Sequence, residues 1–390
     1  MTVPAFEIAR LPAIRFGAGR VAEAPAQVAA YGERVLIVTG ARSFRATPRW
    51  ERLLEGLRER GIEWRETQVT DEPSPQLVDQ AVDQHRSWRP QSVLGIGGGS
   101  VLDAAKAIAG LLPHQTRVLD HLEGVGRGLP YEGPATPFIA VPTTAGTGSE
   151  ATKNAVLSLR GEGGYKKSFR HETLVARVAI VDPDLLDSCP RGLMAAQGMD
   201  AFTQLLESYV SIRSNPMTDA LAWSGMEAFR DGLFRALDGD PAGRARIAYG
   251  SLQSGICLAQ TGLGSVHGLA SPLGAFFPIP HGVVCGTLLA EATEVNIRAL
   301  RERAPESPAL AKYARVGVML CGAAREEGLE ALVQTLRDWT QRLELARIGA
   351  YGMQEADIPR VVANCRGGSM QTNPLVLSDE ELAGLLRRRI

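Results

Sequence analysis

A change of pattern near residue 185 constrains the fold more than any other feature of this sequence. Before it, short β-branched runs alternate with stretches of helical periodicity, whereas after it the chain consists of Ala- and Leu-rich segments of helical length. Such alternation predicts parallel strands covered by helices, so we expect an open α/β domain over residues 1–185 and an all-α domain over residues 186–390. The boundary lies in the segment DPDLLDSCP, residues 182–190, where a strand ends in a turn with two prolines.

The expected elements follow from this pattern, because parallel strands covered on both faces are continuous apolar runs. Strands are expected at residues 35–38, 93–96, 138–141 and 178–181. Helices are expected at residues 48–60, 101–112, 192–212, 216–236, 242–260, 309–323, 328–345 and 379–389. The first two helices belong to the α/β domain and the others to the helical domain.

The composition argues against several classes of partner. Lys and Arg number 42 against 43 Asp and Glu, so the net charge of −1 favours neither nucleic acid nor an anionic membrane. The first residues carry Glu7 and Arg10 where a signal peptide needs an unbroken apolar stretch, and no apolar run is long enough to span a membrane. The five cysteines lack CxxC spacing, which is typical of reduced thiols. We therefore expect a soluble protein of the cytoplasm.

Two glycine-rich turns follow expected strands. GGGS, residues 97–100, lies directly between a buried strand and a helix, where exposed backbone N–H groups and the helix start can hold a pyrophosphate. VPTTAGTGSEAT, residues 141–152, offers hydroxyl groups that suit phosphate, ribose or a nicotinamide amide. Either segment could instead be a tight turn whose hydroxyls cap its own backbone. Together, at the carboxyl ends of strands in one sheet, they indicate a nucleotide site.

The choice of nucleotide depends on the end of the first expected strand. A sheet of this kind often places an acidic residue there against the adenosine ribose, but this chain has Gly40, Arg42 and Ser43 instead. A guanidinium and a hydroxyl suit a 2′-phosphate, which favours NADP over NAD, although Arg42 could equally be a surface arginine. We count Ser74 among the cofactor-binding candidates as well.

A dispersed set of polar residues in the helical half could hold a metal. Asp200 and Gln204 lie four residues apart, so a helix would place both on one face. His267 and His281 lie in segments punctuated by glycine and proline, where a helix begins or the chain turns. Spacing alone leaves open that these histidines are ordinary core or surface residues.

Taken in order, these motifs resemble the iron-containing (group III) alcohol dehydrogenase family. The matching segments span at least residues 16–296 and read FGAGR, IGGGSVLDAAKAIA, PTTAGTGSEAT, GYKKSF, VDPDLLDSCP, GMDAFTQLLESYVS, NPMTDALA and GSVHGLASPLGAFFPIPHG. The resemblance implies a Rossmann-like domain and a helical domain with NAD(P) between them, a divalent metal, and interconversion of alcohols with aldehydes or ketones. It also implies a homodimer in which an N-terminal strand, here residues 5–9, pairs across the interface.

The resemblance assigns roles residue by residue. The ligand aspartate falls on Asp200 and two ligand histidines on His267 and His281. The pyrophosphate contacts fall on Gly98, Gly99 and Ser100, with Asp103 at the start of the helix. The contacts on the nicotinamide side fall on Thr143, Thr144, Thr147, Ser149 and Asn154, and a lysine that contacts the cofactor falls on Lys166.

Two positions depart from the family pattern. Gln204 stands where DAxTHxxE has a ligand histidine, and Ser271 stands where HGxxHPLG has a histidine that supports the site or handles a proton. An amide oxygen binds more weakly than imidazole, so we expect Asp200, Gln204, His267 and His281 to form a retained but weakened site. Fe²⁺ and Zn²⁺ are the expected metals and Mn²⁺ a further candidate; three ligands without Gln204 would also suit zinc. We expect Ser271 to be catalytic with the ligands, and a hydroxyl, a water chain or the cofactor ribose to carry the proton.

The expected function is therefore that of a metal-dependent, NAD(P)-linked alcohol dehydrogenase or aldehyde reductase with a small substrate. A first alternative keeps the fold but not the metal, as in the maleylacetate reductases, where hydrogen-bond donors assist hydride transfer to an activated carbonyl. A second is a nucleotide-binding protein with a decayed site. A lyase resembling dehydroquinate synthase ranks below the dehydrogenase, because the helical half has no basic cluster near the expected ligands.

Overall fold

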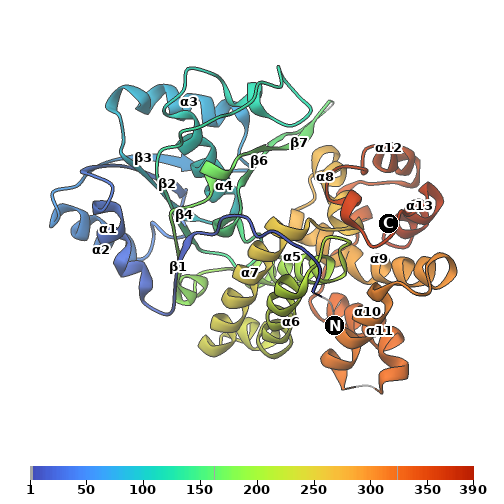
Figure 1. Ribbon diagram of the computed structural model, residues 1–390. Coiled ribbons are helices and arrows are strands. Elements are labelled where there is room, and N and C mark those ends of the chain that lie inside the picture. Colours follow the sequence, from blue (N-terminus) through green and yellow to red (C-terminus); the bar gives the residue numbers. More distant parts are fainter. Residues whose placement is uncertain (1–2, 162, 323) are drawn as a thin grey trace.

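The structure is a computed structural model that describes the whole chain except residues 1–2, 162 and 323. It has two domains that lie side by side, an α/β domain drawn in blue to green and a helical domain drawn in yellow-green to red (Figure 1). The predicted two-part organisation is confirmed. The expected boundary after residue 185 falls within a short 3₁₀ turn, Pro183–Leu186, and remains a prediction.

A six-stranded parallel sheet forms the centre of the first domain. Its spatial order is β1-β8-β5-β4-β2-β3, and every neighbouring pair is parallel. The strands are β1 (Ala13–Phe16), β2 (Arg34–Gly40), β3 (Glu63–Val69), β4 (Ser92–Gly97), β5 (Phe138–Pro142) and β8 (Val178–Val181). The four predicted strands are the ones buried on both faces, whereas β1 and β3 lie at the edges and were missed because their residues are largely polar or exposed.

Apolar side chains of each central strand serve two separate cores. In β2, Leu36 and Val38 point into the cluster formed with α3 (Pro75–His85) and α4 (Gly99–Leu111). Val35 and Ile37 point into the opposite cluster, which contains α1 (Ala24–Ala29) and α2 (Pro48–Arg58). All four side chains are fully buried, which explains why the run VLIV is apolar without alternation.

The order of the strands creates a switch point between β2 and β4. The chain runs outward from β2 to β3 and then returns to the other side of β2 to form β4, from which it continues to β5. In open α/β sheets, ligands bind at such a point, outside the carboxyl ends of the strands. Gly40 and the GGGS turn lie at those ends. A separate antiparallel hairpin, β6 (Asn154–Leu159) and β7 (Tyr165–Arg170), extends toward the second domain (Figure 1).

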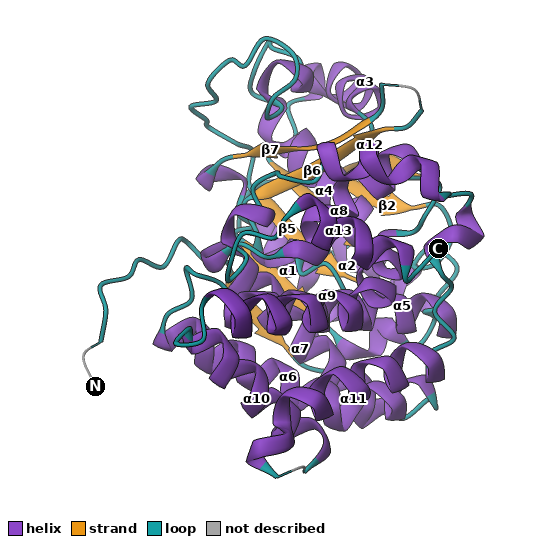
Figure 2. Cartoon of the chain, turned by 90° about the vertical axis from the view of Figure 1, so that its right-hand side faces the viewer, coloured by secondary structure: helices purple, strands orange, loops and turns teal. Residues whose placement is uncertain are grey.

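The second domain is built from helices around α5, most of whose residues are buried. The helices are α5 (Arg191–Val210), α6 (Pro216–Leu237), α7 (Pro241–Thr261), α8 (Ser265–Phe276), α9 (His281–Arg303), α10 (Pro308–Cys321), α11 (Gly328–Arg342), α12 (Ile358–Ala363) and α13 (Asp379–Arg387). Figure 2 shows them stacked in front of and below the sheet. None of the described helices is long and apolar enough to cross a membrane.

Local sequence signals set most helix starts. Asn215, Asp240, Ser307 and Ser378 each accept a hydrogen bond from a backbone N–H of the first turn, and the first three precede a proline at the first helical position. The end of the predicted helix 309–323 includes residue 323, which lies outside the described residues. Helices α8 and α9 were not predicted, because glycines and prolines interrupt the apolar pattern around them.

Two glycines allow the domains to touch backbone to backbone. Gly148, in the second glycine-rich turn, has a φ of 60°, and a Cβ placed there would lie 2.3 Å from the Cα of Gly255 in α7. A Cβ on Gly255 would in turn lie 2.2 Å from the carbonyl oxygen of Gly148. Any side chain at either position would force the turn away from the helical domain.

We therefore expect Gly148→Ala to destabilise the protein more than a matched change at Gly19, which has a φ of 75° but no atom within 4 Å of the place that a methyl group would take. The positive φ should cost about 1–2 kcal/mol in both variants, whereas overpacking should cost Gly148→Ala about 1–3 kcal/mol more. Chemical denaturation would measure the difference in the free energy of unfolding. If both variants lost the same free energy of unfolding, the contact between Gly148 and Gly255 would be able to relax without cost.

Candidate active site

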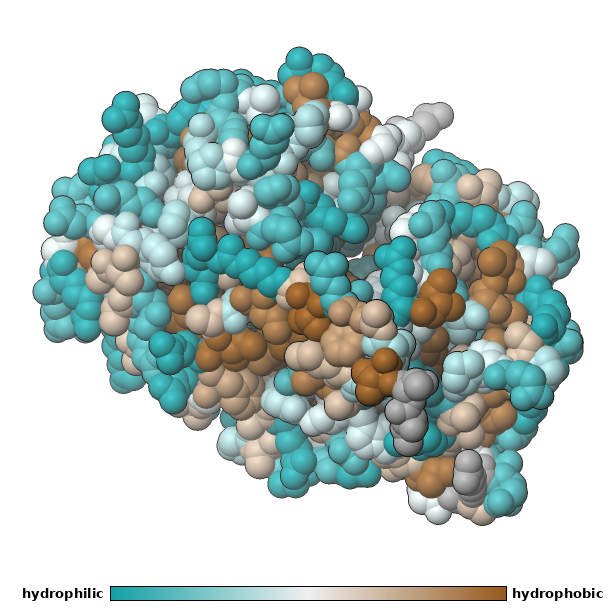
Figure 3. Space-filling model, viewed as in Figure 1, coloured by the Kyte–Doolittle hydropathy of each residue, from teal (hydrophilic) through white to brown (hydrophobic). Residues whose placement is uncertain are grey.

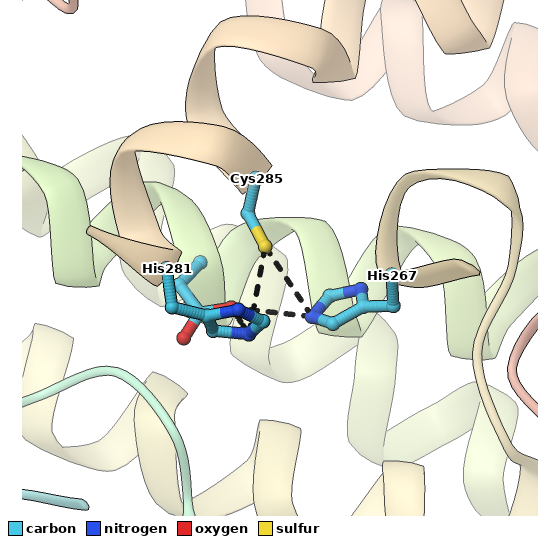
Figure 4. Close-up of side chains that lie close together, drawn as sticks. His267, His281 and Cys285 are labelled. Carbon is cyan, nitrogen blue, oxygen red and sulfur yellow. Dashed lines mark hydrogen bonds and ion pairs between the residues drawn. The ribbon is translucent and has the colours of Figure 1, made fainter. Parts of the chain in front are cut away.

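Three helices bring together, inside the second domain, four side chains that could hold a metal ion. Asp200 comes from the middle of α5, His267 from the first turns of α8, and His281 and Cys285 from the first two turns of α9. One potential ligand atom from each lies within 4.8 Å of all the others. Figure 4 shows His281 and Cys285 facing His267 across this point. The structure thus brings together the carboxylate and two imidazoles expected from the sequence, together with a cysteine that was not expected.

The separations within the cluster are short. Oδ1 of Asp200 lies 3.2 Å from Nε2 of His267 and 3.7 Å from Nε2 of His281. Sγ of Cys285 lies 3.6 Å and 3.7 Å from the same two nitrogens. Asp200 and Cys285 have no exposed surface, and His267 is buried as well.

Glu207 orients the ring of His267. It lies on α5 two turns after Asp200, and its Oε2 is 2.6 Å from Nδ1 of His267, while its Oε1 accepts the backbone N–H of Val266 at 2.7 Å. This contact leaves Nε2 of His267 facing the cluster, as in other sites where a carboxylate supports a histidine ligand. Glu207 was assigned no role from the sequence, although it is the last residue of the motif DAFTQLLE.

The electrostatics of the cluster favour positive charge. Burial alone would raise the pKa of Asp200, but the rings of His281 and His267 lower it to about 2, so the carboxylate is ionised at neutral pH. Burial lowers the pKa of His281 to about 4, and its ring is therefore neutral. Burial also acts to lower the pKa of His267, but the acidic groups of Cys285, Glu207 and Asp200 raise it well above its usual value. The site therefore attracts either a proton or a cation.

Two buried polar atoms of the cluster have no hydrogen-bond partner among the described residues. They are Oδ2 of Asp200 and Nδ1 of His281. An unsatisfied buried polar atom is costly, and a buried carboxylate especially so. Because Nε2 of His281 faces the cluster, the unpaired oxygen of Asp200 is the atom that bears on a metal, and together with the convergence of oxygen, nitrogen and sulfur donors it fits a bound divalent cation.

Gln204 lies beside the cluster, one helical turn after Asp200. Its Nε2 donates to Oδ1 of Asp200 at 3.2 Å, and its Oε1 accepts from Oγ of Ser254 at 2.8 Å. In this orientation the amide N–H, and not the amide oxygen, faces the carboxylate. That Gln204 supplies a fourth ligand therefore remains a prediction.

Ser271 lies on α8, one turn after His267. Its Oγ is 3.4 Å from the backbone oxygen of Lys166 in β7, to which it donates. The hydroxyl therefore connects α8 to the hairpin of the first domain. Its predicted part in catalysis remains a prediction.

The two glycine-rich turns pack directly against each other at the switch point. A Cβ on Gly99 would lie 2.6 Å from Cγ2 of Thr147, and one on Gly98 would lie 3.3 Å from the side chain of Thr144. The N–H of Thr143 donates to the oxygen of Gly97 at 2.9 Å. Gly98 precedes α4, so the free N–H groups of the first helical turn, including that of Ser100, begin at this junction. The geometry suits an anion held between the turns.

A buried lysine missed in the sequence fixes the second turn. Lys106 of α4 is fully buried, and its Nζ donates to the backbone oxygens of Ser149 (2.9 Å) and Asn154 (2.7 Å) and to the hydroxyls of Ser149 and Thr152 (both 3.0 Å). Asp103 accepts hydrogen bonds from the Ser149 hydroxyl and from the N–H of Val156. Ser149 and Asp103 are thus engaged within the protein, where they position the turn, and their contact with a nucleotide remains a prediction.

The remaining predicted cofactor residues surround the same edge of the sheet. Lys166 of β7 lies 3.2 Å from Glu72 and is close enough to His281 to lower the pKa of that ring. Arg42 and Ser43 are exposed just after β2. The hydroxyl of Ser74 accepts from the N–H of Leu77 and caps α3. Nucleotide contacts of these residues remain predictions.

The turn and the cluster belong to one hydrogen-bonded region. Ser254 of α7, which contacts Gln204, also lies 3.5 Å from the backbone oxygen of Gly146 in the second turn. A Cβ on Gly146 would clash with the side chain of Gln197 of α5. A nucleotide held by the turns would therefore lie next to the helices that carry the cluster.

Two family profiles and several individual proteins are similar to this chain in sequence. The profile described as "Iron-containing alcohol dehydrogenase" matches residues 12–183, and the one described as "Fe-containing alcohol dehydrogenase family, C-terminal" matches residues 194–390. The NADPH-dependent butanol dehydrogenase of Clostridium saccharobutylicum is 27% identical over 371 residues, which cover 90% of each chain. The lactaldehyde reductase of Escherichia coli K12 is 31% identical over 314 residues, which cover 77% of this chain and 78% of the relative.

A solved structure shares the whole architecture. The crystal structure of a 1,3-propanediol oxidoreductase superposes with a TM-score of 0.89 at 26% identity, over 99% of this chain and 100% of that one. The similarity includes both domains, so the placement of helices around the cluster is that of this group of proteins.

The contact between Glu207 and His267 predicts the effect of a substitution. Glu207→Gln should weaken zinc binding by about 10–100-fold, because a neutral amide no longer orients and polarises the ring. Titration with Zn²⁺ against a competing chelator would measure the affinity. Glu330→Gln, which removes an exposed ion pair with Arg301, is the matched control. Equal affinities in the two variants would contradict the role of Glu207.

Proposed function

The chain belongs to the iron-containing alcohol dehydrogenase family, and on that basis we propose that it is a metal-dependent, NAD(P)-linked oxidoreductase that interconverts a small alcohol and the corresponding aldehyde or ketone. The observation that carries the proposal is the buried convergence of Asp200, His267 and His281 beside the glycine-rich turns. An oxidoreductase of this kind needs a polarising cation next to a nicotinamide, and the two parts of this arrangement supply places for both.

Each residue of the cluster has a definable task. Asp200 supplies a charged oxygen and His267 and His281 supply neutral nitrogens, while Glu207 keeps the His267 ring in position. A divalent cation held there would polarise the oxygen of the substrate, and a nicotinamide would exchange hydride with its carbon. Burial of the cluster excludes bulk water and strengthens the electrostatic effect.

The proposed nucleotide is NADP. Arg42 and Ser43 follow β2 at the switch point, where a 2′-phosphate would lie in a dinucleotide fold. The relative from Clostridium saccharobutylicum carries NADPH in its name, which agrees with this choice. Gly98 and Gly99 let the two glycine-rich turns pack together beside the free N–H groups at the start of α4, which would hold the pyrophosphate.

The proposed metal is Fe²⁺ or Zn²⁺, with Mn²⁺ a further candidate. Imidazole ligands suit iron and zinc, and carboxylate oxygen is accepted by all three metals. The metal-independent alternative is suggested by Gln204, which stands where the family pattern has a ligand histidine. The donor set that remains, with a buried Asp200 carboxylate whose Oδ2 has no partner among the described residues, supports the metal-dependent function instead.

We also propose that the protein is a cytoplasmic homodimer. Residues 5–9 form no strand within this chain, β1 lies at the edge of the sheet, and the apolar residues Val3, Phe6 and Ile14 are exposed. Figure 3 shows apolar side chains gathered in a band across the middle of this face. A second copy that paired along β1 would cover the free edge and part of the band.

Removal of the metal tests the proposed function. Chelation should abolish the reduction of small aldehydes with NADPH or NADH, and Fe²⁺ or Zn²⁺ should restore it. His267→Ala should lose metal and turnover together, while nucleotide binding and the circular dichroism spectrum stay as in the wild type. Full turnover in stripped protein would contradict the proposal and favour a metal-independent reductase.

The proposed nucleotide preference has a separate test. Arg42→Ala should raise KM for NADPH about tenfold, because a charge-assisted contact of about 1.5–3 kcal/mol is lost, and should leave KM for NADH unchanged. Arg52→Ala, at an exposed position of α2, is the matched control. A wild-type preference for NADH, or equal changes for both nucleotides, would show that Arg42 is an ordinary surface residue.

A further inference from the structure

The cluster contains a donor that the family pattern does not include. We propose that the sulfur of Cys285 is the fourth protein ligand of the cation, in place of the missing histidine, and that Gln204 does not ligate. This inference rests on the proposed function, because it concerns the same site. It makes the ligand set one carboxylate, two imidazoles and one thiolate.

Helix geometry places Cys285 correctly for this role. His281 is the first residue of α9 and Cys285 lies four residues later, so both side chains project from the same face. Figure 4 shows the sulfur between the two imidazole rings. Cys285 is fully buried, so its sulfur faces the cluster and not solvent.

The separations match those of a tetrahedral site. Zinc bonds of about 2.0–2.3 Å to oxygen, nitrogen and sulfur imply about 3.3–3.6 Å between any two donors of a tetrahedron. The sulfur of Cys285 lies 3.6 Å from His267 Nε2 and 3.7 Å from His281 Nε2. Oδ1 of Asp200 lies 3.2 Å and 3.7 Å from the same nitrogens. These four separations lie within about 0.1 Å of that range, and all four donors lie within 4.8 Å of one another, so one cation could contact them together.

The environment of Cys285 differs from that of the other four cysteines. The sulfurs of Cys189, Cys257, Cys321 and Cys365 each contact a backbone carbonyl oxygen, as a buried or helical thiol ordinarily does. The sulfur of Cys285 contacts two ring nitrogens instead. A thiol could donate to one ring nitrogen and accept weakly from the other, whereas a thiolate that shares a cation with both rings would make the same two contacts.

Gln204 is occupied elsewhere. Its oxygen accepts from Ser254 and its N–H group faces Asp200, so it presents hydrogen atoms to the place where a cation would lie. Turning the amide by 180° would direct its oxygen toward the cluster and its nitrogen toward Ser254, whose hydroxyl can donate to the Ser251 oxygen at 2.8 Å. That arrangement is the competing ligand set, and experiment can separate the two.

A thiolate changes the chemistry of the site. Carboxylate and thiolate together neutralise a divalent cation, whereas a set with one carboxylate and three neutral donors leaves a charge of +1. Soft sulfur ligands favour zinc over Mn²⁺ or Mg²⁺. We therefore infer that this chain is adapted to a thiophilic cation such as Zn²⁺.

X-ray absorption at the zinc edge tests the inference directly. The full-length protein is stripped, loaded with one equivalent of Zn²⁺ and measured without substrate. We expect one sulfur neighbour at about 2.3 Å together with nitrogen or oxygen neighbours. Protein loaded with Co²⁺ should likewise show a thiolate-to-metal charge-transfer band.

Four variants identify the source of the sulfur. Cys285→Ser should lose the sulfur neighbour and bind Zn²⁺ at least about tenfold more weakly. Cys257→Ser, at another buried thiol, and Cys321→Ser, at the exposed one, should keep the sulfur neighbour. Gln204→Ala should keep it as well.

Each other outcome overturns the inference in a recognisable way. Zinc with only nitrogen and oxygen neighbours in the wild type would exclude Cys285 and leave the metal-dependent function standing. A sulfur neighbour that persists in Cys285→Ser would assign it to a different cysteine. Less than one zinc per chain at saturating Zn²⁺ would overturn both this inference and the proposed metal site.

Discussion

A carboxylate without any exposed surface lies at the centre of this protein, and the arrangement of the helical domain depends on it. Burial of an ion is costly unless opposite charge or hydrogen bonds compensate it. Asp200 obtains that compensation from side chains of α8 and α9, so both helices must begin next to the middle of α5. The positions of His267, His281 and Cys285 follow from this single requirement.

The first domain is connected to that centre by backbone and not by long side chains. Gly148 and Gly255 let the second glycine-rich turn touch α7, and Lys106 fixes the turn from the other side through buried hydrogen bonds. Because the turn is held on both sides, the proposed places for a nucleotide and for a cation are fixed relative to each other within the protein itself. Such preorganisation is what hydride transfer between two bound groups requires.

The sequence predicted the parts of this molecule whose signal is local. Runs such as VLIV are buried on both faces and were found as strands, whereas the polar edge strand β3 was not, because only pairing with β2 stabilises it. Asp200, His267 and His281 were predicted as ligands through motifs, but their convergence depends on tertiary packing. Cys285 and Lys106 were missed because an isolated cysteine in an apolar segment and a lysine in an Ala-rich helix indicate nothing by spacing alone.

The central claim is that a cation binds where the three helices meet and acts there on the substrate. Anomalous diffraction from crystals loaded with the active metal and NADPH, recorded at the absorption edge of that metal, tests it most directly. We predict one peak per chain within bonding distance of Asp200, His267 and His281. The absence of a peak at that position, in crystals of a protein preparation that reduces aldehydes at full rate, would contradict this claim.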